Sequence, residues 1–124
     1  MNALVAEWVA KAEGDLHTAR REVRVRRNAN YDAVCYHAQQ CAEKMLKAYL
    51  VAQNQNPLFT HNLVELLQKC LKHDKTFDLI RLDLEALNGY GVVIRYPGTS
   101  AGKQDATDAV KSTQRVRDFV LPKL

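Results

Sequence analysis

The chain has 124 residues, of which 47% are hydrophobic and 26% charged, and its formal net charge is +4. These values predict one folded domain over residues 1–124 with a single modest core, and they exclude a disordered chain. No apolar run is long enough to cross a bilayer, the N-terminus carries glutamates that a signal peptide would lack, and cysteine is scarce, so we expect a soluble cytoplasmic protein with reduced thiols.

Apolar residues at three- and four-residue steps predict a first helix from residue 3 to about 27, with Asp15 at the edge of its apolar stripe. The turn formers Asn28 and Asn30 interrupt this pattern. A second helix is expected from about Tyr31 to Gln53. One side of this helix is apolar, and the other is rich in amides and charges. The polar side is the first candidate for a functional surface.

A break at Pro57 separates the second helix from a third, which is expected to begin near Asn62. Asn62 and Glu65 have the spacing of a capping box. A fourth helix is expected over about Phe77–Asn88 and a last one over about Gln104–Val120. Five helices with short connections predict an all-α, up-and-down antiparallel bundle.

Four stretches of the sequence resemble the HEPN domain family: WVAKAEGDLHTAR, YHAQQCAEKMLKAYL, THNLVELL and RYPG. They occur in the expected order over nearly the whole chain, and the glutamine pair followed by Ala-Glu-Lys is the most specific part. The resemblance implies a helical bundle that commonly dimerises and is associated with nucleotide or RNA chemistry. Many bacterial and archaeal members are encoded with a minimal nucleotidyltransferase, and several such pairs behave as toxin and antitoxin.

Many members of that family are metal-independent ribonucleases with an arginine, four to six further residues and then a histidine. None of the histidines in this chain has an arginine at that distance, and Arg95, which fits the motif arginine by its location, has no histidine after it. We therefore expect a non-catalytic binding protein, the partner of a minimal nucleotidyltransferase. The alternative is a divergent ribonuclease that uses Arg95 with the distant His61.

Arg95 and Tyr96 stand in IRYPG, beside a proline–glycine turn that can hold a guanidinium group towards a cleft. A guanidinium group binds phosphate through two parallel hydrogen bonds, so Arg95 is a candidate ligand-binding residue. A structural arginine that caps helix carbonyls or pairs with a carboxylate is the alternative. Tyr96 is a candidate acceptor of a nucleotidyl group from the partner enzyme.

Gln40, Lys44 and Lys47 lie one turn apart on the second helix and share a face. We expect this face to line a dimer interface or to meet an anionic ligand beside Arg95, and a solvated face is the alternative. His61 precedes the Asn62 cap. Its imidazole is a candidate acid or base, although a histidine beside a cap more commonly hydrogen-bonds the turn.

The stretch REVRVRR concentrates positive charge at the end of the first helix, in Arg20, Arg21, Arg24, Arg26 and Arg27. Arginine clusters bind RNA phosphates, and cations also suit a helix C-terminus electrostatically. No aromatic residues are interleaved for base stacking, which favours a solvated helix end over a nucleic-acid site.

The glycine-rich region after the fourth helix contains GVVIR, a strand-like stretch that cannot form a sheet alone, and GTSAGKQ, which imitates a phosphate loop. The latter is one residue short of the motif and lacks a parallel sheet, so a flexible loop is expected, with an anion at the following helix N-terminus as a remaining alternative. His37 and Cys41 are too few for a zinc site. We expect no metal and no cofactor.

Overall fold

The computed structural model describes residues 1–57, 59–91, 94 and 96–124. Within this part of the chain all regular structure is helical, which confirms the predicted all-α bundle. The α-helices, in chain order, are α1 (Ala3–Val23), α2 (Tyr31–Ala52), α3 (Leu63–Leu71), α4 (Arg81–Leu87) and α5 (Lys103–Val120). Two short 3₁₀ helices accompany them, η1 (Lys75–Ile80) and η3 (Leu121–Lys123).

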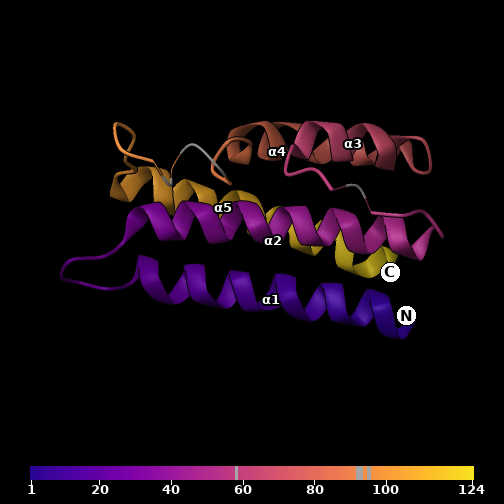
Figure 1. Cartoon of the computed structure of the whole chain (residues 1–124), viewed down its shortest axis with the longest axis horizontal. Helices are drawn as coiled ribbons and strands as arrows, with labels where there is room; N and C mark the ends of the chain where they lie inside the picture. Colours follow the sequence, from indigo (N-terminus) through magenta and orange to yellow (C-terminus); the bar gives the residue numbers. More distant parts are fainter. Residues whose placement is uncertain (58, 92–93, 95) are drawn as a thin grey trace.

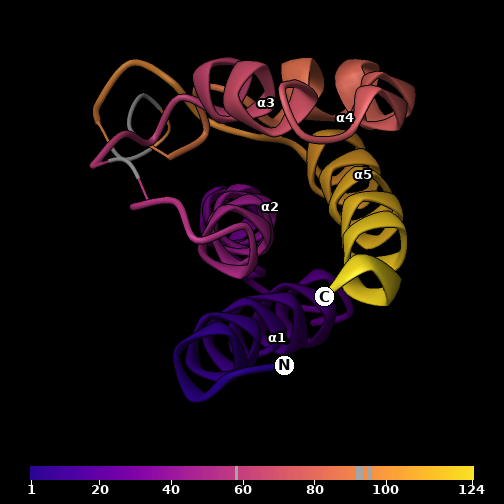
Figure 2. The same cartoon turned by 90° about the vertical axis from the view of Figure 1, so that its right-hand side faces the viewer.

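The helix α2 is the centre of the bundle. Viewed along the bundle, α1 lies against one side of α2, α5 against a second and the short α3 and α4 against a third, while only loop segments lie on the side opposite α5 (Figure 2). The long helices run along the longest axis, and the two chain termini lie at the same end (Figure 1). Most of α2 is therefore buried, including polar residues. None of the described helices has the length and apolar character that a membrane crossing requires.

Asparagine side chains fix the starts of the two longest helices. The Oδ1 atom of Asn2 accepts the backbone N–H of Val5, and that of Asn30 accepts the backbone N–H of Ala33, at 2.8 and 2.9 Å. These bonds satisfy first-turn donors that have no partner within the helix. Asn28 has a left-handed φ of 53°, which asparagine tolerates better than most residues. The left-handed backbone conformation of Asn28 therefore contributes to the predicted turn between α1 and α2.

The first helix ends at Val23, four residues earlier than the expected limit of about 27. The N–H groups of Arg24 and Val25 bond to carbonyls three residues back, which tightens the last turn. The side chain of Val25 remains 38% exposed, so this stretch has no apolar face to pack on the bundle. Without such a face the helix ends.

The capping box predicted for the third helix is only half formed. Asn62 accepts the N–H groups of Val64 and Glu65, as predicted, but the Glu65 carboxylate accepts the hydroxyl of Thr60. The Thr60 hydroxyl oxygen in turn accepts the N–H of Asn62. A threonine two residues before the cap thus takes the position that the glutamate was expected to fill.

The predicted fourth helix is divided into η1 and α4. Asp74 caps η1 by accepting the N–H of Thr76, and the 3₁₀ winding stacks Phe77 and Ile80 on one side, so both enter the core. The apolar positions were predicted correctly and the winding was not. Of the strand-like stretch, Val92, Val93 and Arg95 lie outside the described residues, and Ile94 belongs to a 3₁₀ turn.

An aromatic cluster holds η1 against α2 and α5. The Phe77 ring is fully buried, with its centroid 4.4 Å from that of Tyr49 and 5.1 Å from that of Phe119. The Lys123 ammonium lies 4.6 Å from the Phe119 ring centroid and 2.7 Å from a carboxylate oxygen of Asp74. Hydrogen bonds from Lys123 and, to a smaller extent, from Thr76 lower the pKa of Asp74 to about 2. This pair fastens the C-terminus to η1.

Phe77→Ala should lower the free energy of unfolding by about 3–5 kcal/mol, because it removes a fully buried ring that packs on Tyr49 and Phe119. Leu79→Ala is the matched control, since Leu79 is two residues away and 78% exposed. Its effect should stay within about 0.5 kcal/mol. Urea unfolding followed by circular dichroism measures both variants. Equal effects would contradict the placement of η1.

Candidate functional site

Two carboxylates are buried beside α2, and each gathers hydrogen-bond donors around it. Glu43 lies on α2 itself with 3% of its surface exposed, and Asp15 reaches α2 from α1 with 9% exposed. A buried ionised carboxylate is costly unless its charge is paired and its oxygens accept hydrogen bonds. The residues that satisfy these two carboxylates therefore define the polar interior of the bundle.

Three side chains donate to Glu43. Lys47 Nζ lies 3.1 Å from Oε2, while His61 Nδ1 and Gln39 Nε2 lie 2.9 and 3.4 Å from Oε1. Lys47 is itself buried, and its ammonium is 5.7 Å from the ring centroid of Trp8 on α1. The His61 side chain is 62% exposed. Because its Nδ1 is bound to Glu43, Nε2 is the ring nitrogen left for a ligand.

The glutamine pair extends this network. Gln40 Nε2 donates to Gln39 Oε1 at 2.8 Å, and Gln39 Nε2 donates to the carbonyl oxygen of His61 at 2.9 Å. Gly91 packs directly on the Gln39 amide, where a Cβ atom would lie 2.7 Å from Oε1. The buried amide thus ties α2 to the segment before α3 and to the loop after α4.

Asp15 forms the second cluster. Its two oxygens accept from His37 Nδ1 at 2.7 Å and from Lys44 Nζ at 2.5 Å. Asp15 is therefore buried at the α1–α2 interface, where both of its oxygens have cationic or N–H partners on α2. The sequence placed Asp15 at the edge of the apolar stripe but gave it no partner.

Gln40, Lys44 and Lys47 belong to this same polar layer, and none of them is freely exposed. The side chain of Lys44 is 23% exposed and that of Lys47 is 8% exposed. Both ammonium groups are compensated by carboxylates of the chain itself. A ligand at this face would therefore meet lysines whose charges are already paired.

Arg95, the predicted phosphate-binding residue, lies outside the described residues. Tyr96 is 64% exposed. Ile94, two residues before it, lines a hollow of about 320 Å³ together with Asp32 and Tyr36 on the first turns of α2. A second hollow, of about 220 Å³, is lined by His61 and by a wall made of Asn62, Asn88, Gly89 and Gly91.

The sequence reasoning did not single out Glu43 or Gly91 as members of the site, and it considered Gln39 only as part of a glutamine pair suited to an interface. It considered His37 only beside Cys41, as a metal ligand, and it gave Asp15 no partner. One signal was available, because an aspartate inside an otherwise apolar stripe requires a buried partner. Glu43 also stands four residues before Lys47, the favourable order for an ion pair on a helix.

The start of α5 is occupied by carboxylates of the chain. Asp32 accepts the N–H of Ala101 at 2.6 Å, and Asp105 accepts the N–H of Gly102 at 2.9 Å. These two carboxylates place negative charge beside the start of α5, where a bound anion would have to lie. The anion-binding alternative for GTSAGKQ is therefore disfavoured by charge.

The three cysteines are buried and free. Burial raises the pKa of Cys35, Cys41 and Cys70 to about 12 in each case, so all three stay protonated at neutral pH. In the described ranges, no three histidine, cysteine or acidic side chains come together as a metal-binding group.

Comparison with known proteins adds the following. The family model of the HEPN domain matches residues 5–123. The chain is similar to the crystal structure of TT1696 from Thermus thermophilus, with a TM-score of 0.84, 25% identity, and coverage of 97% of this chain and 98% of that one. It is also similar to ST0689, an archaeal HEPN homologue, with a TM-score of 0.75, 25% identity and 96% coverage of both chains. No curated protein matches.

Gly91→Ala should lower the free energy of unfolding by about 1–3 kcal/mol, because the new methyl group displaces a buried amide with several hydrogen bonds. Gly14→Ala is the matched control, since a Cβ there meets open space in the middle of α1. It should raise stability by up to about 1 kcal/mol. Thermal and urea unfolding of both variants test the opposite signs, and a stabilising Gly91→Ala would contradict the close contact with Gln39.

Proposed function

The chain belongs to the HEPN domain family, and we propose that it acts there as a nucleotide- or RNA-associated binding protein without a ribonuclease activity of its own. Its partner in this proposal is a minimal nucleotidyltransferase, in a pair of the toxin–antitoxin type. The observation that carries the proposal is the absence of the family's ribonuclease motif, since no histidine of the chain follows an arginine at the required distance.

The polar layer around α2 supports a binding role over a catalytic one. Lys44 and Lys47 are held in ion pairs with Asp15 and Glu43, so neither ammonium is free to stabilise a developing phosphate charge. A satisfied buried network also makes the surrounding surface rigid. A rigid surface suits recognition of a partner protein, because less conformational entropy is lost when the complex forms.

Tyr96 is the proposed acceptor of a nucleotidyl group. Its side chain is exposed and precedes the Pro97–Gly98 turn, so the hydroxyl is accessible to the active site of another protein. In the proposed step, the phenolic oxygen attacks the α-phosphorus of a nucleoside triphosphate held by the partner. A new P–O bond forms, pyrophosphate leaves, and a base of the partner enzyme takes the phenolic proton.

A homodimer completes the proposal. In the described part of the chain, no helix lies on the side of α2 opposite α5, where Figure 2 shows loop segments. An interface between two copies was expected for the α2 face that carries Gln40, Lys44 and Lys47. Pairing two copies there would cover the polar layer from outside, as the family resemblance leads us to expect.

One observation favours the alternative of a divergent ribonuclease. Glu43 holds His61 through Nδ1 and leaves Nε2 at the 220 Å³ hollow, an arrangement that suits a general acid or base. In that alternative Arg95 would supply the positive charge that stabilises the transition state. The two functions make different demands on His61, so they can be separated experimentally.

Co-expression with a minimal nucleotidyltransferase of the same organism should yield a co-purifying complex. With radiolabelled ATP, the label should transfer to this chain and should be lost in Tyr96→Phe, which removes only the acceptor oxygen. Tyr31→Phe is the matched control, because Tyr31 lies on α2 and is partly buried. An unlabelled chain, or a label that survives Tyr96→Phe, would rule out Tyr96 as the acceptor.

The purified protein, incubated with end-labelled single-stranded RNA, should leave the RNA uncut on a denaturing gel. Cleavage that is lost in both Arg95→Ala and His61→Ala would establish the ribonuclease alternative. His73→Ala is the control, since His73 is exposed but lies beyond α3, away from the Glu43 network. Cleavage that survives all three substitutions would indicate a contaminating nuclease.

A further inference from the structure

Five arginines form a patch at one end of the bundle: Arg20, Arg21, Arg24, Arg26 and Arg27, here called the arginine cluster. All five are exposed, and among the described residues none of their guanidinium groups has a hydrogen bond or an ion pair. Of the 18 lysines and arginines of the chain, these five leave 13 against 14 aspartates and glutamates. The positive excess of the protein is therefore located in this cluster.

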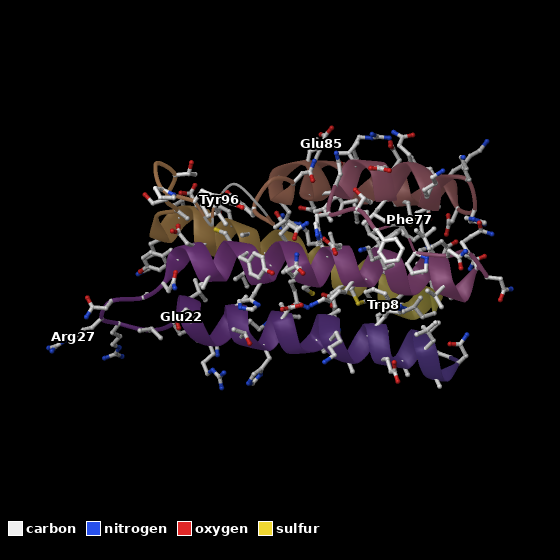
Figure 3. The ribbon with its side chains drawn as sticks, viewed as in Figure 1. Trp8, Glu22, Arg27, Phe77, Glu85 and Tyr96 are labelled. Atoms are coloured by element: carbon white, nitrogen blue, oxygen red, sulfur yellow. The ribbon has the colours of Figure 1, made fainter. Side chains whose placement is uncertain are left out.

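A helix terminus accounts for only part of the cluster. Arg20 and Arg21 lie in the last turn of α1, where cations suit the helix dipole. Arg26 and Arg27 lie beyond the end of the helix, in the loop to α2, and Arg27 projects past the end of the bundle (Figure 3). These two guanidinium groups are placed for contact with something outside the chain.

Three carboxylates near the arginine cluster, those of Glu22, Asp32 and Asp105, each accept a hydrogen bond from a backbone N–H group. Glu22 lies on the α2 side of α1 (Figure 3) and accepts the N–H of Asn30 at 2.9 Å. Asp32 accepts the N–H of Ala101, and Asp105 that of Gly102. Because these acidic groups are engaged by backbone donors, they do not pair with the arginine cluster.

An exposed aromatic side chain lies near the start of α2, the helix that directly follows the arginine cluster. Ile94, two residues before Tyr96, lines the 320 Å³ hollow with Asn30 and Asp32. Figure 3 shows Tyr96 in the same half of the bundle as Arg27, inward of it and on the side of α2 away from α1, although about 70 residues separate the two in sequence. Tyr96 is 64% exposed, so its ring is open for stacking. The base-stacking partner that the arginine-rich stretch lacks in sequence is thus supplied by another segment of the chain.

We propose that the arginine cluster and Tyr96 form a binding surface for a single-stranded nucleic acid. The guanidinium groups contact successive phosphates, and the Tyr96 ring stacks on a base, which is how proteins bind single strands without reading their sequence. Within the cluster's span, Val23 and Val25 are the only aliphatic side chains and Val23 is partly buried, so the surface does not suit insertion into a membrane. The proposal deepens the RNA-associated role proposed above and rests on it.

Fluorescence anisotropy of a labelled oligouridylate of about 20 nucleotides, titrated over a range of salt concentrations, tests the surface. The triple variant R24A/R26A/R27A spares the last turn of α1 and should reduce the slope of log affinity against log salt by about 2, since each phosphate contact of a single strand contributes about 0.7. Tyr96→Ala should weaken binding by about 5- to 150-fold, as expected for the loss of one stacked base. Tyr96→Phe, which keeps the ring, should weaken it much less.

The matched control is K69A/K72A/K75A, which removes the same charge from exposed lysines near the end of α3. Lys69 and Lys72 line a hollow with Leu50, close to the C-terminal end of α2, whereas the arginine cluster adjoins its N-terminal end. Equal losses of affinity in the two triple variants, or an unchanged salt slope in R24A/R26A/R27A, would overturn the proposal. So would phosphatidylserine vesicles that bind through the arginine cluster while the oligonucleotide does not.

These outcomes are separate from those of the proposed function. A chain that co-purifies with the nucleotidyltransferase and is labelled on Tyr96, yet binds no oligouridylate, would end this inference and leave the proposed partnership intact. A chain that binds oligouridylate through the arginine cluster but is never labelled would do the reverse.

Discussion

The burial of Glu43 and Asp15 against α2 is the constraint on which the rest of the structure depends. Because α2 is surrounded by α1, α5 and the short helices, its polar residues cannot all reach solvent. Each buried carboxylate therefore has to find partners inside the chain, at a cost of several kcal/mol if one partner is removed. Lys47 and His61 meet this demand for Glu43, and Lys44 meets it for Asp15. Through these contacts, one helix fixes the positions of α1 and of the segment before α3.

Because Lys44 and Lys47 are paired inside the chain, they are weaker candidates for binding an anion than the exposed loop residues. An ammonium group that is already paired with a carboxylate contributes little to a second anion, so the α2 face with Gln40, Lys44 and Lys47 is mainly structural within one copy of the chain. Of the candidate site residues that the sequence suggested and the structure describes, the exposed ones, His61 and Tyr96, lie on loops. Loops held by a rigid scaffold are where binding residues commonly occur. In the proposed function, the buried network therefore supports the loops that carry these two residues.

The fold could be predicted from the sequence because its signals are local. Apolar spacing identified α1, α2 and α5, and Asn62 was identified as the cap of α3 from residues within one turn. The site depends on contacts between distant segments, so it was less accessible. Lys44 and Asp15 are 29 residues apart in the sequence. Gly91 contacts Gln39 although α3, η1 and α4 lie between them in the sequence. The four-residue spacing of Glu43 and Lys47 is visible in the sequence, but no periodicity indicates that Lys44 will meet a carboxylate of α1. The winding of η1 was missed for another reason, because 3₁₀ and α-helices place Phe77 and Ile80 on the same side.

The distribution of charge explains how a chain with a modest net charge can still present a strong local field. Cations around α2 are balanced within the bundle, whereas the arginine cluster begins in the last turn of α1, continues beyond its end and has no acidic partners in the described part of the chain. Exposed charges are screened beyond about 8 Å at physiological salt, so only cations that lie close together act jointly on a polyanion. The five arginines lie within eight residues of sequence and are unpaired, whereas the charges of Lys44 and Lys47 are balanced by their own carboxylate partners. The chain therefore keeps the charges that are paired inside the bundle apart from the charges that are unpaired at its surface, and the unpaired arginines begin in the last turn of α1.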